Sequence, residues 1–162
     1  MSPIMQSESA RMNSAAEARF RITAPNSTPQ SVAVIALDGA GEDAVRRLSA
    51  GTWQHATFLI AQPGGDHLLD VSGRLRRIAD EVAAADLVVL VAGPGGRAYA
   101  AAAVGEACSL RRVTTTGFIV GAASSFDPEL PKTLAQLRPW SLMVVIAGND
   151  EYIDDMMTAL RA

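Results

Sequence analysis

Two short glycine-rich segments of this sequence carry the residue types best suited to holding a small anion. The first runs from Asp38 to Asp43 and contains Gly39 and Gly41. Glycines let the backbone approach a ligand closely, and a helix that begins here would offer free N–H groups and a partial positive charge to a phosphate. The carboxylates of Asp38, Glu42 and Asp43 would compete with that anion. Alternatively, Asp38 caps the helix and the other two are ordinary acids of its first turn.

The second segment is Gly93-Pro-Gly-Gly96, which is followed directly by Arg97. Three glycines in four residues, Gly93, Gly95 and Gly96, are more than a turn requires. They are typical of a loop whose backbone N–H groups wrap around an anion. Arg97 would then supply a bidentate donor for a phosphate or carboxylate. The alternative is a tight turn with Arg97 facing solvent.

A third polar segment is Gly148-Asn-Asp150, in which Asn149 either contacts a ligand or helps to cap the last helix. No catalytic residue can be assigned, because the sequence has neither a G-x-S-x-G elbow nor a phosphate loop ending in Lys-Ser or Lys-Thr. His55 and His67 lack the cysteine or histidine partners of a metal site, so none is predicted.

The elements that would position these segments alternate along the chain. Apolar runs predict buried strands at 31–37, 57–61, 87–92, 115–121 and 142–147, with a short extended piece at 66–72. Helices are expected at 42–50, 74–85, 97–110, 129–138 and 150–161. The buried side of the second of these helices is assigned to Leu75, Ile78 and Val82.

This alternation predicts the α/β class: a three-layer, Rossmann-like parallel sheet with helices on both faces. In such sheets ligands bind beyond the carboxyl ends of the strands. All three polar segments follow strands directly, so the predicted topology brings them to that one edge. Residues 31–162 are expected to form a single domain, and residues 1–30, rich in Ser, Ala and Pro, a flexible N-terminal tail.

Composition and charge exclude some classes of binding partner. The net charge of −3 argues against binding to nucleic acid or to anionic membranes, both of which require a basic face. No apolar run reaches the roughly 18 residues of a membrane span. The single cysteine, Cys108, excludes an internal disulfide and favours a cytoplasmic location. The hydrophobic fraction of 49% favours a homo-oligomer, with a symmetric dimer as the expected form.

Taken in order, the segments resemble the nucleotide-binding domain of the FtsZ/tubulin superfamily. Ser31–Arg47, "SVAVIALDGAGEDAVRR", is similar to that family's first strand, glycine loop and helix. Ala85–Ala107, "ADLVVLVAGPGGRAYAAAAVGEA", is similar to the strand that leads into its phosphate-binding loop. Thr116–Gly121 resembles the strand after that, and Leu142–Ile153, "LMVVIAGNDEYI", a strand that ends in an Asn-Asp pair.

The departures from the family pattern concern function. Asp38, Glu42 and Asp43 intrude into the first loop, Asp43 standing where the family has Asn, and the second loop continues as Gly96-Arg-Ala-Tyr99 in place of a Gly-Thr-Gly ending. The sequence also ends before the family's long core helix and its catalytic loop. The resemblance therefore implies the fold and the binding of GTP, GDP or another nucleotide, without GTP hydrolysis or filament assembly.

Three functional hypotheses follow. The first is a protein that binds a nucleotide or another small phosphate-containing anion through the glycines of both loops, Asp43, Arg97 and Asn149. The second is a protein-interaction module whose glycine loops are relics. The third is a metal-assisted enzyme, with Asp38 or Asp43 as base or Mg²⁺ ligand and Arg97 as anion clamp. If Asp38, Asp43 and Arg97 converge on one pocket, the enzyme hypothesis gains.

Overall fold

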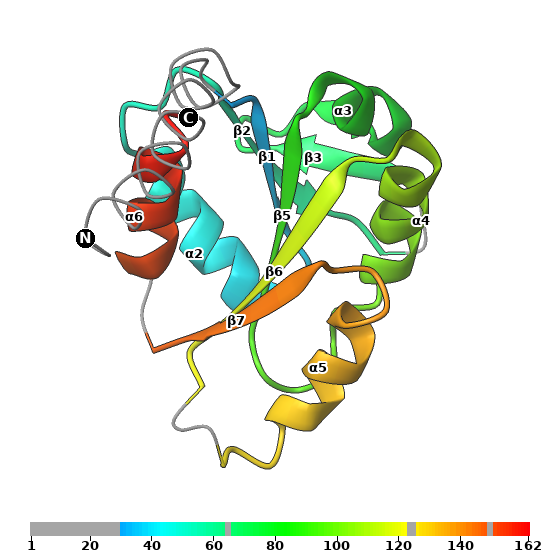
Figure 1. Cartoon of the computed structure of the whole chain (residues 1–162), viewed down its shortest axis with the longest axis vertical. Coiled ribbons are helices and arrows are strands. Elements are labelled where there is room, and N and C mark those ends of the chain that lie inside the picture. The colour runs from blue at the N-terminus through cyan, green and yellow to red at the C-terminus, as the bar shows by residue number, and fades with distance from the viewer. Residues whose placement is uncertain (1–29, 64–65, 123–125, 149–150) are drawn as a thin grey trace, which may run out of the picture.

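The structure is a computed structural model that describes residues 30–63, 66–122, 126–148 and 151–162 (Figure 1). Strands and helices alternate along most of the chain. In chain order they are β1 (Val32–Ala36), α2 (Gly39–Ser49), β2 (Ala56–Ala61), β3 (His67–Asp70), β4 (Leu75–Arg77), α3 (Ile78–Ala84), β5 (Leu87–Ala92), α4 (Ala101–Arg111), β6 (Thr114–Val120), α5 (Leu130–Leu137), β7 (Met143–Ala147) and α6 (Glu151–Ala159).

The strands form one sheet in the order β4-β3-β2-β1-β5-β6-β7. From β2 to β7 every neighbouring pair is parallel, whereas β3 and β4 add an antiparallel hairpin at one end. Numbered in chain order, the parallel strands lie as 2-1-3-4-5, one of the common orders of doubly wound sheets. The predicted α/β class with a largely parallel, Rossmann-like sheet is confirmed. The strand order reverses at β1, between β2 and β5, which is where such sheets bind ligands.

Helices cover both faces of the sheet. Figure 1 shows α2 and α6 on one face and α3, α4 and α5 on the other. Successive strand residues alternate between the two cores, so that Ile35 packs beneath one set of helices and Val34 beneath the other. The side chains of β5 are buried on both faces, which explains why this strand reads as an unbroken apolar run. The predicted three layers are therefore present.

One expected helix is wrong at its start. Residues 74–85 were expected to be helical throughout, but Leu75–Arg77 forms β4 and the helix begins only at Ile78. Leu75, which was assigned to the buried side, is 63% exposed. The remaining assignments of that helix are confirmed, because Ile78 and Val82 are buried.

The side chain of Asp70 explains the departure. Its Oδ1 accepts hydrogen bonds from the backbone N–H of Ser72 and of Arg74 at 3.0 and 2.9 Å, and from the Ser72 hydroxyl at 2.6 Å. Gly73, at φ 88°, occupies the left-handed position of this turn. The turn reverses the chain, so the residues after it pair with β3 instead of starting the helix.

The predicted tail, residues 1–30, lies outside the described residues except for Gln30. Among the helices that are described, none is both long enough and apolar enough to cross a membrane.

Candidate functional site

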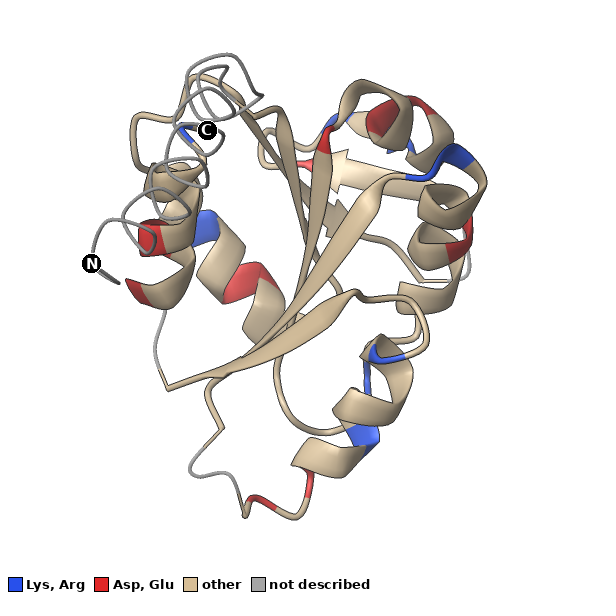
Figure 2. Ribbon diagram, in the orientation of Figure 1, with Lys and Arg blue, Asp and Glu red and all other residues tan. Residues whose placement is uncertain are grey.

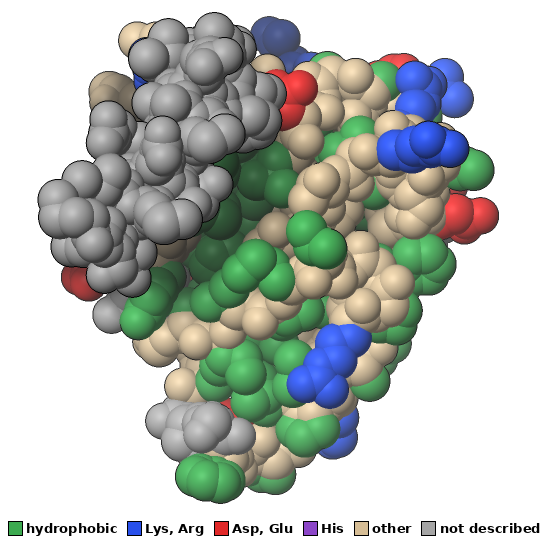
Figure 3. Space-filling model, in the orientation of Figure 1, with side chains coloured by type: hydrophobic (Ala, Val, Ile, Leu, Met, Phe, Trp, Pro, Cys, Tyr) green, Lys and Arg blue, Asp and Glu red, His purple; other side chains and the backbone are tan. Residues whose placement is uncertain are grey.

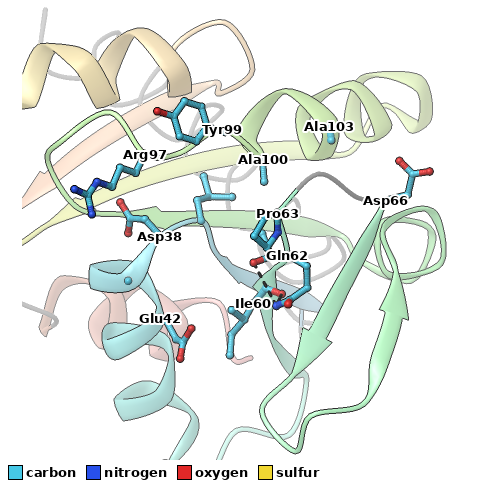
Figure 4. Close-up of a pocket in the computed structure, with 13 residues that line it drawn as sticks. Asp38, Glu42, Ile60, Gln62, Pro63, Asp66, Arg97, Tyr99, Ala100 and Ala103 are labelled. Atoms are coloured by element: carbon cyan, nitrogen blue, oxygen red, sulfur yellow. Dashed lines mark hydrogen bonds between the residues drawn. The ribbon is translucent and has the colours of Figure 1, made fainter.

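A cleft opens at the carboxyl ends of β1, β2 and β5 (Figure 4). Its volume is about 570 Å³, within the range of small-molecule sites. The start of α2 and the residues after β2 form two of its sides, and the segment that leads from the second glycine loop into α4 forms another. The lining residues are Leu37, Asp38, Gly39, Glu42, Ile60, Ala61, Gln62, Pro63, Asp66, Arg97, Tyr99, Ala100 and Ala103.

The charged residues of the cleft are unequal in number. Asp38, Glu42 and Asp66 contribute carboxylates, and Arg97 is the one basic residue in the lining. Figure 4 shows Arg97 and Asp38 toward one end of the cleft and Asp66 toward the other. No hydrogen bond or ion pair involves the Arg97 side chain within the described ranges of the chain. Its guanidinium therefore keeps its full donor capacity for a ligand.

The rest of the lining is largely apolar. Ile60 and Pro63 lie on the β2 side of the cleft and Ala100 and Ala103 on the α4 side (Figure 4). Tyr99 stands at the rim with 77% of its surface exposed. An exposed tyrosine beside a small apolar cavity can cover one face of a planar ring.

The Asp38 carboxylate lies at the base of the cleft and joins the two glycine segments. Its Oδ1 accepts the backbone N–H of Gly41 at 2.8 Å, which makes Asp38 the N-cap of α2. The same carboxylate accepts the N–H of Gly93, at 3.1 Å for Oδ1 and 2.9 Å for Oδ2. The capping alternative considered for Asp38 is thus confirmed. Because this cap starts α2 at Gly39, the helix begins three residues earlier than expected.

Two of the glycines are required by packing. A Cβ on Gly41 would overlap the carbonyl oxygen of Val91, so only glycine lets α2 pass this close to β5. A Cβ on Gly93 would lie 2.6 Å from the Cβ of Ala40. By contrast, a Cβ on Gly39 would meet nothing within 4 Å, since Gly39 faces the cleft.

The backbone of the Gly93–Gly96 loop is hydrogen-bonded to α5 and to Glu129, the residue that precedes α5. The N–H of Gly95 donates to the Glu129 carbonyl at 3.2 Å, and that of Gly96 to the Thr133 hydroxyl at 3.0 Å. That hydroxyl in turn donates to the Gly93 carbonyl at 2.8 Å. Thr133 is fully buried. The N–H groups of Gly93, Gly95 and Gly96 therefore all bond within the protein.

Gln136 completes this arrangement one turn further along α5. Its Oε1 accepts the N–H of Ala98 at 2.8 Å, and its Nε2 donates to the Gly96 carbonyl at 2.9 Å. A nucleotide polyphosphate held by the N–H groups of Gly93, Gly95 and Gly96, as the FtsZ/tubulin resemblance implies, does not fit this loop. Ligand contact by these glycines through other atoms stays a prediction.

The structure separates the residues proposed for a metal-assisted enzyme. Asp38 and Arg97 line the cleft, whereas Asp43 lines a different cavity of about 400 Å³ beside α6 and the carboxyl ends of β6 and β7. Asn149 lies outside the described residues. In the parts of the chain that are described, no three His, Cys, Asp or Glu side chains come together in a way that could hold a metal ion.

Sequence reasoning did not single out Gln62, Asp66 or Tyr99. Gln62 follows β2 directly, so the rule that ligands bind beyond the strand ends could have nominated it. Tyr99 lies two residues beyond Arg97, in a stretch expected to be helical, although α4 begins only at Ala101. Asp66 reaches the cleft because the chain turns back there into the β3–β4 hairpin, of which the sequence predicted only an extended piece at 66–72.

Comparison with known proteins adds no family to this description. No protein-family model matches the chain, and none of the curated proteins matches it either.

Proposed function

We propose that this protein binds a small molecule with a single phosphate and a planar ring, such as a mononucleotide, in the cleft between β1, β2 and β5. The observation that carries the proposal is the guanidinium of Arg97 in the lining of that cleft, which makes no hydrogen bond or ion pair within the described parts of the chain. It stands where the strand order of the sheet reverses, which is the position at which doubly wound sheets bind ligands.

The charge balance of the lining supports one phosphate and disfavours several. A single phosphate can form a bidentate pair with Arg97. A second or third phosphate would face the carboxylates of Asp38, Glu42 and Asp66, which repel it unless a cation intervenes. The N–H groups of the second glycine loop do not offset this repulsion, because they bond inside the protein.

The remaining lining supports a ring. Ile60, Pro63, Ala100 and Ala103 provide apolar contact, and Tyr99 can stack on an aromatic face. Gln62 adds an amide that can both donate to and accept from the polar edge of such a ring. Its present hydrogen bonds, to the carbonyls of Ile60 and Ala61, are long at 3.4 Å, so a ligand can replace them at little cost.

The polar contacts of Asp38 favour binding without catalysis. The enzyme alternative needs the Asp38 carboxylate as a base or metal ligand, but that carboxylate already accepts the N–H groups of Gly41 and Gly93. Asp43, the other candidate, lines a different cavity. We therefore keep GTP hydrolysis and filament assembly out of the proposal.

Thermal melting with a matched set of ligands tests it. The set pairs AMP and GMP with adenosine and guanosine, and adds GTP, GDP and NAD with and without Mg²⁺. A ligand at 100 times its Kd stabilises the fold by about 2.7 kcal/mol, a rise in Tm of several degrees for a domain of this size. We expect a mononucleotide to raise Tm more than its nucleoside does.

Arg97→Ala separates the phosphate contact from the rest of the cleft. It is expected to abolish the difference between nucleotide and nucleoside, while Arg111→Ala, at an exposed position in the last turn of α4, preserves it. An unchanged response in Arg97→Ala would show that the phosphate contact is wrongly assigned. If no ligand in the set moves Tm, the protein-interaction alternative gains, and the cleft has another occupant.

A further inference from the structure

The two ends of the sheet differ in charge. The cleft at the carboxyl ends of the strands is lined by three carboxylates and one guanidinium. At the amino ends of β6 and β7 lies another cavity, of about 330 Å³, and Arg112 is the one charged residue among the described residues that line it. The other lining residues are Val113, Thr114, Thr115, Pro139, Trp140, Ser141 and Leu142. This cavity is therefore basic, although the whole chain carries a net charge of −3.

Three arginines flank this cavity. Arg111 and Arg112 lie at the end of α4, and Arg138 follows α5 and directly precedes Pro139. All three residues are exposed, and none of their side chains has a hydrogen bond or ion pair in the part of the chain that the structure describes. Figure 2 shows these basic positions at the junction of α4 with β6 and at the end of α5, and Figure 3 shows hydrophobic and uncharged side chains between them. Their charges are available to attract an anionic partner.

Trp140 gives the cavity a fixed aromatic surface. A Cβ on Gly105 of α4 would overlap the Trp140 side chain, so glycine at this position lets the indole pack against the helix. Leu142, two residues after Trp140 in the same lining, is 80% exposed. An apolar side chain of a partner that entered the cavity would contact both residues.

Ser141 indicates a polar contact in the same place. It lines the cavity, and its hydroxyl is buried with no hydrogen-bond partner among the described residues. Buried hydroxyls usually have a partner, because an unpaired one has given up its hydrogen bonds to water. Rotation about χ1 would turn the hydroxyl toward the cavity, where a polar group of a ligand would supply the partner.

We propose that this end of the protein binds an acidic peptide segment of another protein. A large apolar residue of the segment enters the cavity against Trp140, and carboxylates on either side of that residue pair with Arg112 and Arg138. Arginine suits this role, because its guanidinium binds a carboxylate through two parallel hydrogen bonds.

The dimensions of the site favour a peptide over a small acid. The cavity lies at the lower limit of small-molecule sites, so it suits one large side chain. Arg111 and Arg138 lie outside its lining, and a ligand that contacts them must extend beyond the cavity, as a peptide does. Nucleic acid is disfavoured, because the net charge of −3 leaves no broad basic face.

Selection from a random dodecapeptide phage library on the immobilised full-length protein tests the proposal. The selected peptides are expected to carry Asp or Glu on both sides of a large apolar residue. Selected peptides without that pattern, or no enrichment over a surface without the protein, would overturn the proposal.

Arg112→Gly combined with Arg138→Ala removes two charges from the site. Arg112 has φ 57°, a left-handed conformation that favours glycine, so the change at this position does not strain the end of α4. We expect the Kd of a selected peptide, measured by fluorescence anisotropy, to rise at least tenfold. Arg74→Ala combined with Arg77→Ala is the matched control, because it removes the same charge from exposed positions beside the β4 edge. Equal losses in the two double variants would mean that the peptide responds to net charge alone, which would overturn the proposal.

Leu142→Glu tests the apolar contact while keeping every arginine. Leu142 is 80% exposed, so the fold should persist, and circular dichroism and Tm check this. The introduced carboxylate would repel the acidic peptide and compete for the arginines, so binding should be lost. Unchanged affinity in the folded variant would place the peptide elsewhere.

Arg97→Ala separates this site from the cleft at the other end of the sheet. The peptide should bind this variant as it binds the wild-type protein, and the response of Tm to a mononucleotide should survive in Arg112→Gly. Loss of peptide binding in Arg97→Ala would assign the peptide to the cleft and overturn the proposal.

Discussion

The two glycine-rich turns of this protein have similar sequences, but their glycines have different structural roles. In the first, Gly41 allows α2 to pass against β5, and Gly39 faces the cleft. In the second turn, hydrogen bonds to α5 and to Glu129, which precedes α5, hold the loop from Gly93 to Gly96 in place. Arg97 follows this loop and lines the cleft. A glycine in such a turn can therefore be required by close packing or by backbone conformation as readily as by a ligand.

Only part of each turn is available for binding. Asp38 ties the two turns together, since it accepts N–H groups from both. What remains open to the cleft is the start of α2 on one side and a side chain, Arg97, on the other. Substitutions in the parts of the turns that are held by packing or internal hydrogen bonds should therefore affect stability. Substitutions in the parts that face the cleft should affect ligand binding.

The largest effect is expected from Gly41→Ala. The added Cβ would overlap the Val91 carbonyl oxygen, which belongs to the central strand β5 and has little room to move. Overpacking against backbone typically costs 1–3 kcal/mol, and we expect about 3 kcal/mol or more here. Urea denaturation followed by circular dichroism measures the change.

Gly39→Ala is the matched control, two residues earlier in the same helix. Its Cβ would meet nothing within 4 Å, so we expect a neutral change or a gain of about 0.5 kcal/mol from reduced freedom of the unfolded chain. Equal stabilities of the two variants would show that α2 does not approach β5 as closely as described. The division of the first turn into a packed part and an open part would then fail.

A smaller loss is expected from Thr133→Val in the second turn. The two side chains have nearly the same shape, but valine neither accepts the Gly96 N–H nor donates to the Gly93 carbonyl. Leaving these buried groups without partners should cost about 1–3 kcal/mol. Thr114→Val, at the exposed first residue of β6, makes the same chemical change without such a cost. Similar denaturation midpoints for the two variants would mean that α5 does not fasten the glycine loop.

Much of the fold could be predicted from the sequence because buried parallel strands leave a strong signal. The apolar runs that became β1 and β5 are buried from both sides, so each reads as continuous. The β3–β4 hairpin was only partly predicted: an extended piece was expected at 66–72, but β4 was assigned to a helix. Leu75, Ile78 and Val82 have helical spacing, and the turn centred on Asp70 overrides it locally.

The site was predictable in location and much less so in detail. The rule about strand ends located the cleft, and Gly39 and Arg97 do line it. That rule could not reveal that the side chains of Thr133 and Gln136, some 40 residues away in sequence, form hydrogen bonds with the backbone of the second loop. Such long-range partners leave no local pattern, because one Thr and one Gln on a helix look like ordinary surface residues.

The β3–β4 hairpin differs from the second glycine loop in the charge of its acceptors. A carboxylate, that of Asp70, holds the hairpin turn, whereas Gly96 and Ala98 donate to neutral side chains. Hydrogen bonds from the Ser72 hydroxyl, and then from the Arg74 N–H, lower the pKa of Asp70 from 3.8 to about 2. Since the folded pKa is depressed, the stability that Asp70 contributes is complete above pH 3.8 and is lost as the pH falls toward 2.

Acidification should therefore loosen the hairpin before it loosens the contacts of Gly96 and Ala98 with α5. Between pH 4 and pH 2 we expect the hydrogen-exchange protection factors of the Ser72 and Arg74 amides to fall more than those of Gly96 and Ala98, whose acceptors do not titrate in this range. In Asp70→Asn the selective fall should disappear, because the amide has no charge to lose. Parallel loss of protection in both turns of the wild-type protein would mean that global acid unfolding, and not Asp70, controls the hairpin.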